Sequence, residues 1–203
     1  MLKNINQIHL LIFSLYTKDY SAVYSMREIT TLLKINYSNA FKRIKELIKE
    51  EILIEKKSGN NNYVTLNLNN LETIHILSFV EQQQKVENST IEDIIKEIIS
   101  IDIFACIGLF GSRASGKSKK DSDWDVFVIS AKKKEVEKVM SKFPYLSNIH
   151  VQFFDDIEFS ESLLSPVETV VKHIVKNKKV IYNPYPFYNL IIKWEKIKYA
   201  PTQ

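Results

Sequence analysis

The stretch from Phe104 to Ile129 constrains the chain most, because it places two apolar segments around a polar loop that ends in acidic residues. It reads FACIGLFGSRASGKSKKDSDWDVFVI. The apolar segments predict two strands, and the glycine, serine and lysine residues predict a loop between them. Asp123 and Asp125 stand at the entrance of the second strand. Residues two apart in a strand point to the same face, roughly 6–7 Å apart, so both carboxylates can reach one divalent cation.

Composition indicates a folded protein of one or two small domains. The chain has 203 residues, of which 45% are apolar and 26% charged. Its single cysteine, Cys106, lies in an apolar strand, which fits a reducing interior and core packing. The first apolar run, His9–Tyr16, is too short to cross a bilayer. We therefore expect a cytoplasmic protein with no membrane partner. Because the net charge is only +4, any contact with nucleic acid must come from clustered basic residues.

The first 68 residues predict three helices followed by a hairpin. Helical periodicity begins near Asn4, and Ser25 with Glu28 forms a capping box that begins a short second helix. Glycine and asparagine between two apolar segments favour a hairpin turn. The predicted helices cover Asn4–Thr17, Ser25–Leu33 and Tyr37–Glu50, and the predicted strands cover Ile52–Lys57 and Tyr63–Leu68.

This order of elements resembles the winged helix-turn-helix family. The resemblance implies that the third helix enters the major groove of DNA and that the hairpin lies along the backbone. Polar side chains at a helix start can reach phosphates or base edges, and basic ones neutralise phosphate. A solvated charged face, a wing that serves dimerisation and a protein-binding module remain open alternatives. The candidate DNA contacts are Tyr37, Ser38, Asn39, Lys42, Arg43 and Lys45 on the helix, and Lys56 and Lys57 on the hairpin.

Three regions are expected along the chain. They are a winged helix-turn-helix domain over 1–68, a connecting helix and linker over 69–88, and a second domain over 89–203. The apolar positions of Asn69–Gln84 make the connecting helix a candidate homodimer contact. Thr90, with Asp93 in the reciprocal position, predicts the cap of the next helix. The remaining predicted elements are helices over Lys132–Lys142, Ser165–Asn177 and Tyr185–Lys196, and strands over Asn148–Phe154 and Lys179–Tyr182.

The central loop matches a P-loop by its letters but not by its context. Gly111–Ser118 satisfies the pattern G-x-x-x-x-G-K-[ST] after an apolar strand. A P-loop needs a helix that begins at its Lys-Ser pair and directs its N-terminal amides at phosphates. Here only Lys-Lys-Asp-Ser-Asp follows Ser118 before the next strand. No helix fits in that space, so the P-loop interpretation is excluded.

The same loop resembles the minimal nucleotidyltransferases of the DNA polymerase beta superfamily. The resemblance rests on Gly111-Ser112-Arg113-Ala114, on Gly116 and on Asp121-Ser122-Asp123-Trp124-Asp125, and it extends from about Thr90 to the end of the sequence. It implies a small mixed sheet flanked by helices, so the whole chain is expected to be α+β. Gly111 and Ser112 would bind the triphosphate of an NTP, with Arg113, Gly116 and Lys117 beside them and Lys119 and Lys120 adding positive charge. Asp123 and Asp125 would hold one or two magnesium ions, or manganese in their place.

The chemistry implied is transfer of a nucleotidyl group from an NTP to a hydroxyl acceptor. Magnesium is a hard ion that prefers oxygen ligands, and two such ions can activate the attacking hydroxyl and stabilise the leaving pyrophosphate. The family has a third carboxylate on a later strand, and here the alignment places Gln152 at that position, with His150 one pleat away. Asp155 and Asp156 look instead like the cap of the following helix.

The replacement of an acid by Gln152 leaves two functions open. The protein is either a nucleotidyltransferase or a DNA-binding transcriptional regulator whose transferase domain is a degenerate nucleotide sensor or a dimerisation scaffold. A third possibility is an antitoxin-like role, because minimal nucleotidyltransferases resemble the antitoxin partners of small helical toxins.

Overall fold

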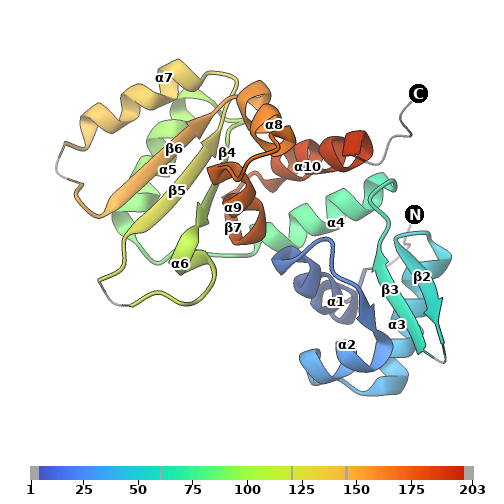
Figure 1. Ribbon diagram of the computed structural model, residues 1–203. Coiled ribbons are helices and arrows are strands. Elements are labelled where there is room, and N and C mark those ends of the chain that lie inside the picture. Colours follow the sequence, from blue (N-terminus) through green and yellow to red (C-terminus); the bar gives the residue numbers. More distant parts are fainter. Residues whose placement is uncertain (1–4, 60, 120, 145, 199–203) are drawn as a thin grey trace. The chain divides into compact units, whose positions relative to one another are not determined.

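A computed structural model of the protein describes residues 5–59, 61–119, 121–144 and 146–198, with the backbone alone for 194–198 (Figure 1). The chain divides into two compact units, Met1–Val80 and Glu81–Gln203. Helix α4 (Leu71–Gln82) crosses this boundary, so that its last two residues belong to the second unit. Within the described residues, no helix is long and apolar enough to span a membrane.

The first unit combines helices with a three-stranded antiparallel sheet of order β1-β3-β2. The predicted capping box is confirmed: the Glu28 amide donates to Ser25 Oγ at 3.2 Å and the Ser25 amide donates to Glu28 Oε2 at 2.6 Å. The hairpin strands pair from Leu53↔Leu66 to Ser58↔Asn61, so pairing continues closer to the turn than predicted. Asn60 of the predicted turn lies outside the described residues. Before α4, the elements are α1 (Gln7–Lys18), β1 (Tyr24–Ser25), α2 (Met26–Leu33), α3 (Tyr37–Lys49), β2 (Leu53–Ser58) and β3 (Asn61–Leu66).

The core of the first unit joins α1 to α3 and the hairpin. Phe13 and Tyr16 of α1 and Ile44 of α3 are fully buried. The Tyr16 hydroxyl donates to the Val64 carbonyl at 3.0 Å, and burial raises the pKa of this phenol. A buried hydroxyl needs such a partner, so this bond fixes the hairpin against α1.

The second unit is built on a mixed four-stranded sheet of order β6-β5-β4-β7, which confirms the predicted α+β class. β4 is antiparallel to β5 and to β7, whereas β5 and β6 are parallel. In chain order the elements are α5 (Ser89–Ile101), β4 (Cys106–Phe110), α6 (Gly111–Ala114), β5 (Trp124–Ile129), α7 (Lys133–Glu137), the 3-10 helix η1 (Lys138–Lys142), β6 (Ile149–Phe154), α8 (Asp156–Leu164), α9 (Val170–Lys176), β7 (Lys178–Tyr182) and α10 (Pro184–Lys198).

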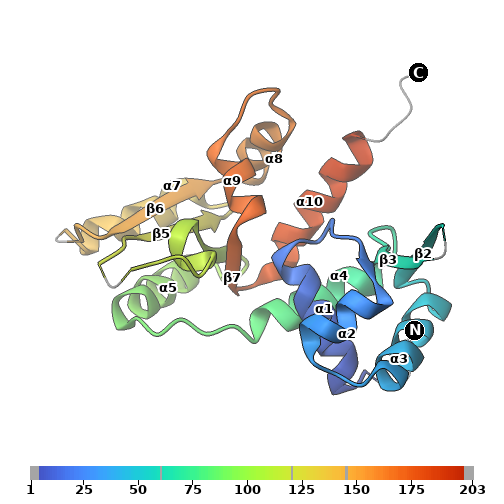
Figure 2. The same ribbon diagram turned by 60° about the horizontal axis from the view of Figure 1, so that its bottom comes forward.

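Helices cover both faces of this sheet (Figure 2). On one face, Val126 and Val128 pack in a buried cluster with Ile94 of α5 and Val136 of α7. The opposite face carries Phe127, and aromatic rings from α10 and α8 pack in sequence against it. The ring centres of Phe127 and Phe187 lie 5.7 Å apart in a tilted arrangement, and those of Phe187 and Phe159 lie 5.9 Å apart edge to face. Because side chains alternate along a strand, Asp125 shares the face of Phe127.

Gly108 in the middle of β4 allows this packing. A Cβ there would lie 2.4 Å from the Phe127 ring and 3.0 Å from the Lys179 carbonyl of β7. The glycine lets the ring lie directly on the backbone of the sheet.

A fully buried charged group lies between α4, β7 and α10. Glu81 accepts a 2.8 Å bond from the Val180 amide and a 2.7 Å bond from the Tyr188 hydroxyl. The ammonium of Lys178 lies 3.7 Å from the same carboxylate, and both side chains are at most 1% exposed. Burial, followed by the nearby Glu81 carboxylate, raises the pKa of Tyr188, which therefore stays a hydrogen-bond donor. We name Glu81, Lys178 and Tyr188 the Glu81 cluster.

Three predicted details differ from the structure. The cap of α5 is Asn88, whose Oδ1 accepts a 3.0 Å bond from the Ile91 amide, so the prediction of Thr90 is wrong. The helix predicted over 132–142 divides into α7 and η1, and α9 begins only at Val170, capped by Thr169. The Trp194 side chain, predicted to pack in the last helix, lies outside the described residues.

Candidate functional site

The two acids lie at one end of the second sheet. Asp123 directly precedes β5, and Asp125 is its second residue. Asp125 pairs with Phe110, the last residue of β4, and with His150 of β6. The acids therefore stand where β4 ends and where the parallel strands β5 and β6 begin.

His150, and not Gln152, is level with the acid pair. The parallel register sets Asp125 against His150 and Phe127 against Gln152, so that Gln152 lies one pleat farther along. His150 Nε2 is 3.7 Å from Asp123 Oδ2, and both side chains are 55% exposed. Among the described residues, no three His, Cys, Asp or Glu side chains stand close enough together to hold a metal ion.

Asp155, which follows β6, is bonded to the start of α8 and does not stand with the acid pair. Its Oδ1 accepts a 2.8 Å bond from the Glu158 amide, and Glu158 Oε2 accepts a 3.1 Å bond from the Asp155 amide. This capping box confirms Asp155 as the cap of α8, with its carboxylate turned to the start of that helix.

Gly111 brings the backbone of the loop against Asp125. Its φ is +71°, and a Cβ at this position would lie 2.5 Å from Asp125 Oδ2. Glycine is therefore needed for two reasons, the left-handed backbone and the approach of the carboxylate. The helix at this loop is the single turn α6, which begins at Gly111; in the described residues from Ser115 to Asp123 there is no helix. This agrees with the exclusion of a P-loop.

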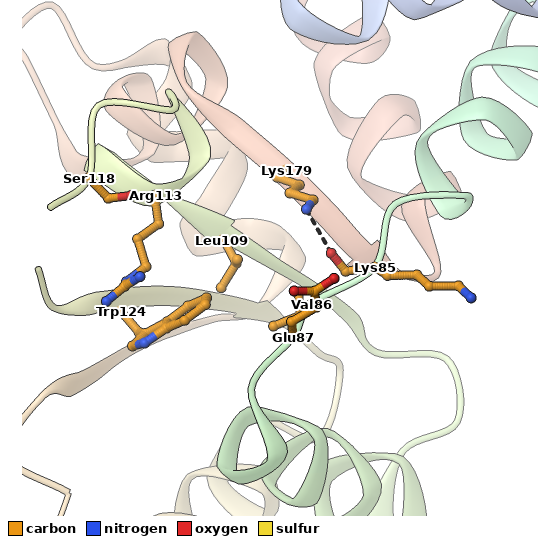
Figure 3. Close-up of a pocket in the computed structure, with 8 residues that line it drawn as sticks. All are labelled: Lys85, Val86, Glu87, Leu109, Arg113, Ser118, Trp124 and Lys179. Atoms are coloured by element: carbon orange, nitrogen blue, oxygen red, sulfur yellow. Dashed lines mark hydrogen bonds between the residues drawn. The ribbon is translucent and has the colours of Figure 1, made fainter. Parts of the chain in front are cut away.

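The Arg113 side chain lies beside Trp124 (Figure 3) and is hydrogen-bonded to the loop at Ser122 and Asp123. Its guanidinium carbon lies 4.0 Å from the centre of the Trp124 ring, and its Nε donates to the carbonyls of Ser122 and Asp123 at 3.1 and 3.2 Å. Trp124 and Leu109 lie on the face of the sheet opposite Asp125, where they line a pocket of about 280 Å³. The predicted nucleotide ligand Arg113 thus positions the acidic loop from the reverse face.

A second pocket, of about 340 Å³, lies on the face that carries Asp125. We name it the Phe110 pocket; its lining residues are Phe110, Gly111, Ser115, Lys117, Val170, His173 and Asn177. The Lys117 amide donates to the Ser112 carbonyl at 3.0 Å, so the loop closes back on itself. Gly116 has a φ of +72° with open space around it.

The structure brings some of the predicted residues together and adds others. Gly111 and Asp125 are in direct contact, Asp123 stands beside His150, and Lys117 lines the Phe110 pocket with Gly111. The contributions of His173 and Asn177 had no signal in the sequence, because α9 is brought to the loop only by tertiary packing. Lys119 is exposed, and Lys120 lies outside the described residues.

The candidate DNA contacts on α3 fall into two groups. Arg43 donates to both carboxylate oxygens of Glu46 at 2.9 and 2.8 Å, and Lys45 donates to both oxygens of Glu55 at 2.9 Å. The exposed group consists of Tyr37, Ser38, Asn39 and Lys42 on α3 and Lys56 and Lys57 on β2.

A small mixed sheet with a Gly-Ser loop after one strand and two acids at the start of the next defines a nucleotidyltransferase type of domain. Comparison with protein families agrees, since residues 89–185, just under half of the chain, match the family described as "Polymerase beta, Nucleotidyltransferase". Residues 89–185 are therefore similar to a nucleotidyltransferase domain.

One similar solved structure is titled "Crystal structure of the toxin-antitoxin with AMP-PNP". It is 20% identical, covers 53% of this chain and 86% of its own, and has a TM-score of 0.33. A TM-score this low carries no argument about fold or partner. No curated protein matches the chain.

Proposed function

We propose that the second unit binds an NTP with magnesium, or manganese in its place, and transfers a nucleotidyl group to a hydroxyl acceptor. The observation that carries the proposal is the contact of the Gly111 backbone with the Asp125 carboxylate, with Asp123 two residues before it. A phosphate-binding loop beside two acids suits a metal-bound triphosphate, because the carboxylates can coordinate the metal ion and the loop can bind the phosphates.

The side chains fit a divalent metal by their chemistry. Carboxylate oxygens are hard ligands, and the missing Cβ of Gly111 leaves Oδ2 of Asp125 room at the loop. Such an ion neutralises phosphate charge and polarises the reacting groups. The exposed Lys117 adds positive charge at the same loop. In the reaction, the acceptor oxygen forms a bond to the α-phosphorus, the bond from that phosphorus to the pyrophosphate oxygen breaks, and the acceptor proton passes to solvent.

The test is incubation with each of the four labelled NTPs and magnesium or manganese, in the presence of a cell lysate as acceptor source. We expect transfer by the native protein and none by Asp123→Ala/Asp125→Ala. The matched control is Asp93→Ala/Asp156→Ala, which removes two exposed acids away from the site and should transfer normally. Transfer that survives in the Asp123/Asp125 variant would contradict the proposal.

A second function is favoured by one observation: the position level with Asp125 holds His150 instead of a third acid. A nucleotide sensor needs binding without transfer, and two acids suffice for binding. Nucleotide binding that depends on Asp123 and Asp125, without transfer to any lysate component, would support this regulatory function over the enzyme.

We also propose that the first unit is a winged helix-turn-helix module that binds DNA through α3 and β2. Its support is the exposed set Tyr37, Ser38, Asn39, Lys42, Lys56 and Lys57, with polar side chains at the start of α3 and lysines on both elements. Because Arg43 and Lys45 are already paired with Glu46 and Glu55, we expect Lys42 to contribute more than either. Exposed Leu71 and Phe79 of α4 (66% and 53%) support a homodimer contact there.

Binding should weaken steeply with salt and be lost in Lys42→Glu/Lys56→Glu. The Arg43→Gln variant should lose less affinity for DNA. The Lys134→Glu variant, which changes an exposed lysine of the second unit, should bind DNA as the native protein does. Equal loss in all three variants would indicate a general charge effect and would remove α3 from the interface.

A further inference from the structure

Two aromatic side chains on neighbouring turns of α3 remain exposed. Tyr37 is 48% exposed and Phe41 is 39% exposed, and their rings lie 6.0 Å apart in a stacked arrangement. The ammonium of Lys45, one turn farther along the helix, lies 5.6 Å from the centre of the Phe41 ring. A single exposed apolar residue is ordinary, but an aromatic pair rimmed by polar side chains marks an interaction surface. The packing of the first unit thus leaves part of both rings accessible to a partner.

The position of Phe41 on α3 places it on the side of the helix that faces the hairpin. Lys45 follows Phe41 by one turn and donates to both carboxylate oxygens of Glu55 on β2 at 2.9 Å. Residues four apart lie on the same side of a helix, so Phe41 is on the β2 side as well. Lys57, two residues after Glu55, shares its face of β2 and is exposed. The aromatic pair therefore borders the surface that α3 and β2 form together.

The charges around this surface suit a polyanion. The carboxylates of Glu46 and Glu55 are already paired with Arg43 and Lys45 of α3. The exposed lysines of α3 and β2 then leave the surface positively charged, which complements the phosphates of a DNA duplex. An apolar protein surface fits less well, because it would remove these lysines from water without offering them a partner.

We propose that Phe41, supported by Tyr37, reads thymine methyl groups in the major groove of DNA. This inference rests on the proposed DNA-binding function of the first unit. A phenyl ring carries no hydrogen-bond donor or acceptor, so it favours an apolar group on a base edge. The major groove presents one such group, the C5 methyl of thymine. Because the Phe41 ring already packs against Tyr37, it loses little freedom when it contacts a base.

The experiment compares two alternating A-T duplexes of equal length, one with thymine and one with uracil throughout. This exchange removes the methyl groups and keeps the phosphates and the hydrogen-bonding edges of the bases. Fluorescence anisotropy at low salt should show binding to the uracil duplex that is weaker by about four-fold or more, since four-fold corresponds to one buried methyl group. The Phe41→Ala variant should bind both duplexes equally, and Phe41→Leu should keep part of the preference.

Two control variants separate methyl readout from general effects. Lys42→Gln should weaken binding to both duplexes by the same factor, because their phosphates are the same. Phe104→Ala removes a ring that is 75% exposed in the second unit and should keep the native affinity for both duplexes. Thermal unfolding followed by circular dichroism checks that Phe41→Ala folds like the native protein.

Two results would overturn the proposal: equal affinity of the native protein for the two duplexes, or a preference for thymine that persists in Phe41→Ala. In both cases, binding that weakens with salt and depends on Lys42 would leave the DNA-binding function in place. Absence of binding to either duplex at low salt would overturn the DNA-binding function as well.

Discussion

The second unit contains two groups of charged side chains that differ in almost every respect. The Glu81 cluster is buried, its carboxylate has two hydrogen-bond donors, and an ammonium lies 3.7 Å away. At the other site, Asp123 and His150 are each 55% exposed, and the two acids stand together with a histidine as the nearby ionisable group of the next strand. The charges of the Glu81 cluster are compensated within the fold, whereas the negative charge of Asp123 and Asp125 is accessible to a ligand.

This contrast separates charge that the fold compensates from charge that is exposed to solvent. A buried charge must find partners within the protein, because desolvation otherwise costs several kcal/mol. An exposed pair of like charges persists in water at small cost, so it places little demand on the fold. Substitutions in the two groups should therefore affect different measurements.

The largest effect on stability is expected for Glu81→Ala. Removing this carboxylate takes away the anion beside the buried Lys178 ammonium and the acceptor of the Tyr188 hydroxyl and the Val180 amide, which costs about 3–5 kcal/mol in the free energy of unfolding. Both tryptophans, Trp124 and Trp194, lie in the second unit, so urea unfolding followed by tryptophan fluorescence reports on this unit. Glu81→Gln, which keeps an acceptor for Tyr188, should lose less. A loss under 1 kcal/mol for Glu81→Ala would break the comparison.

A smaller effect, on both stability and binding, is expected for Gly111→Ala. The left-handed backbone costs about 1–2 kcal/mol with a Cβ, and the new methyl group must displace Asp125. Gly116→Ala is a matched control, since its φ is +72° but no atom lies within 4 Å of the new Cβ. Both variants should lose similar stability, and only Gly111→Ala should also lose metal-dependent nucleotide binding in a direct titration.

His9 in the first unit is an intermediate case that adds a dependence on pH. The side chain is 1% exposed and its Nε2 lies 3.2 Å from Glu46 Oε2. Burial lowers the pKa of His9 below its ordinary 6.5, although Glu46 opposes this shift. The unfolded chain therefore takes up a proton first, so stability should fall as the pH decreases through 6.5 toward the folded pKa, and be unaffected by this group above about pH 7.5. An NMR titration of the His9 ring and urea unfolding of His9→Gln, whose pH slope should be shallower, check the sign.

The smallest effect on stability is expected for Asp125→Asn. Neutralising one of two neighbouring acids removes repulsion and leaves packing unchanged, so unfolding should change by no more than about 0.5 kcal/mol, in the stabilising direction. The same variant should lose nucleotide transfer. A destabilisation of several kcal/mol would mean that this acid is structural, like Glu81.

The elements of the fold were largely predictable, because their signals are local. The capping box at Ser25, the apolar strands on both sides of the central loop and the acids at the start of β5 follow from neighbouring residues alone. Caps are less certain where several polar residues adjoin: Asn88, Ser89 and Thr90 can each cap a helix, and local sequence does not decide among them.

The neighbours of the acids were not predictable in the same way. Which residue of β6 stands beside Asp125 depends on strand register, and a shift of two residues exchanges His150 for Gln152 without moving any side chain to the other face. The stacking of Arg113 on Trp124 and the approach of α9 to the loop are likewise tertiary. Sequence predicts the chemistry of the site, whereas its surroundings depend on the fold.

The order of strands in the second sheet has a consequence for synthesis of the protein. β4 lies between β5, which follows within about twenty residues, and β7, which is separated from it by the rest of the sheet, the α-helices α6 to α9 and the 3-10 helix η1. The first unit can close its local hairpin as soon as it leaves the ribosome, but one edge of β4 stays unpaired until Lys178–Tyr182 emerges. The Glu81 cluster needs β7, because Lys178 and the Val180 amide belong to it, so nascent chains truncated before β7 should have an incomplete second unit that chaperones bind.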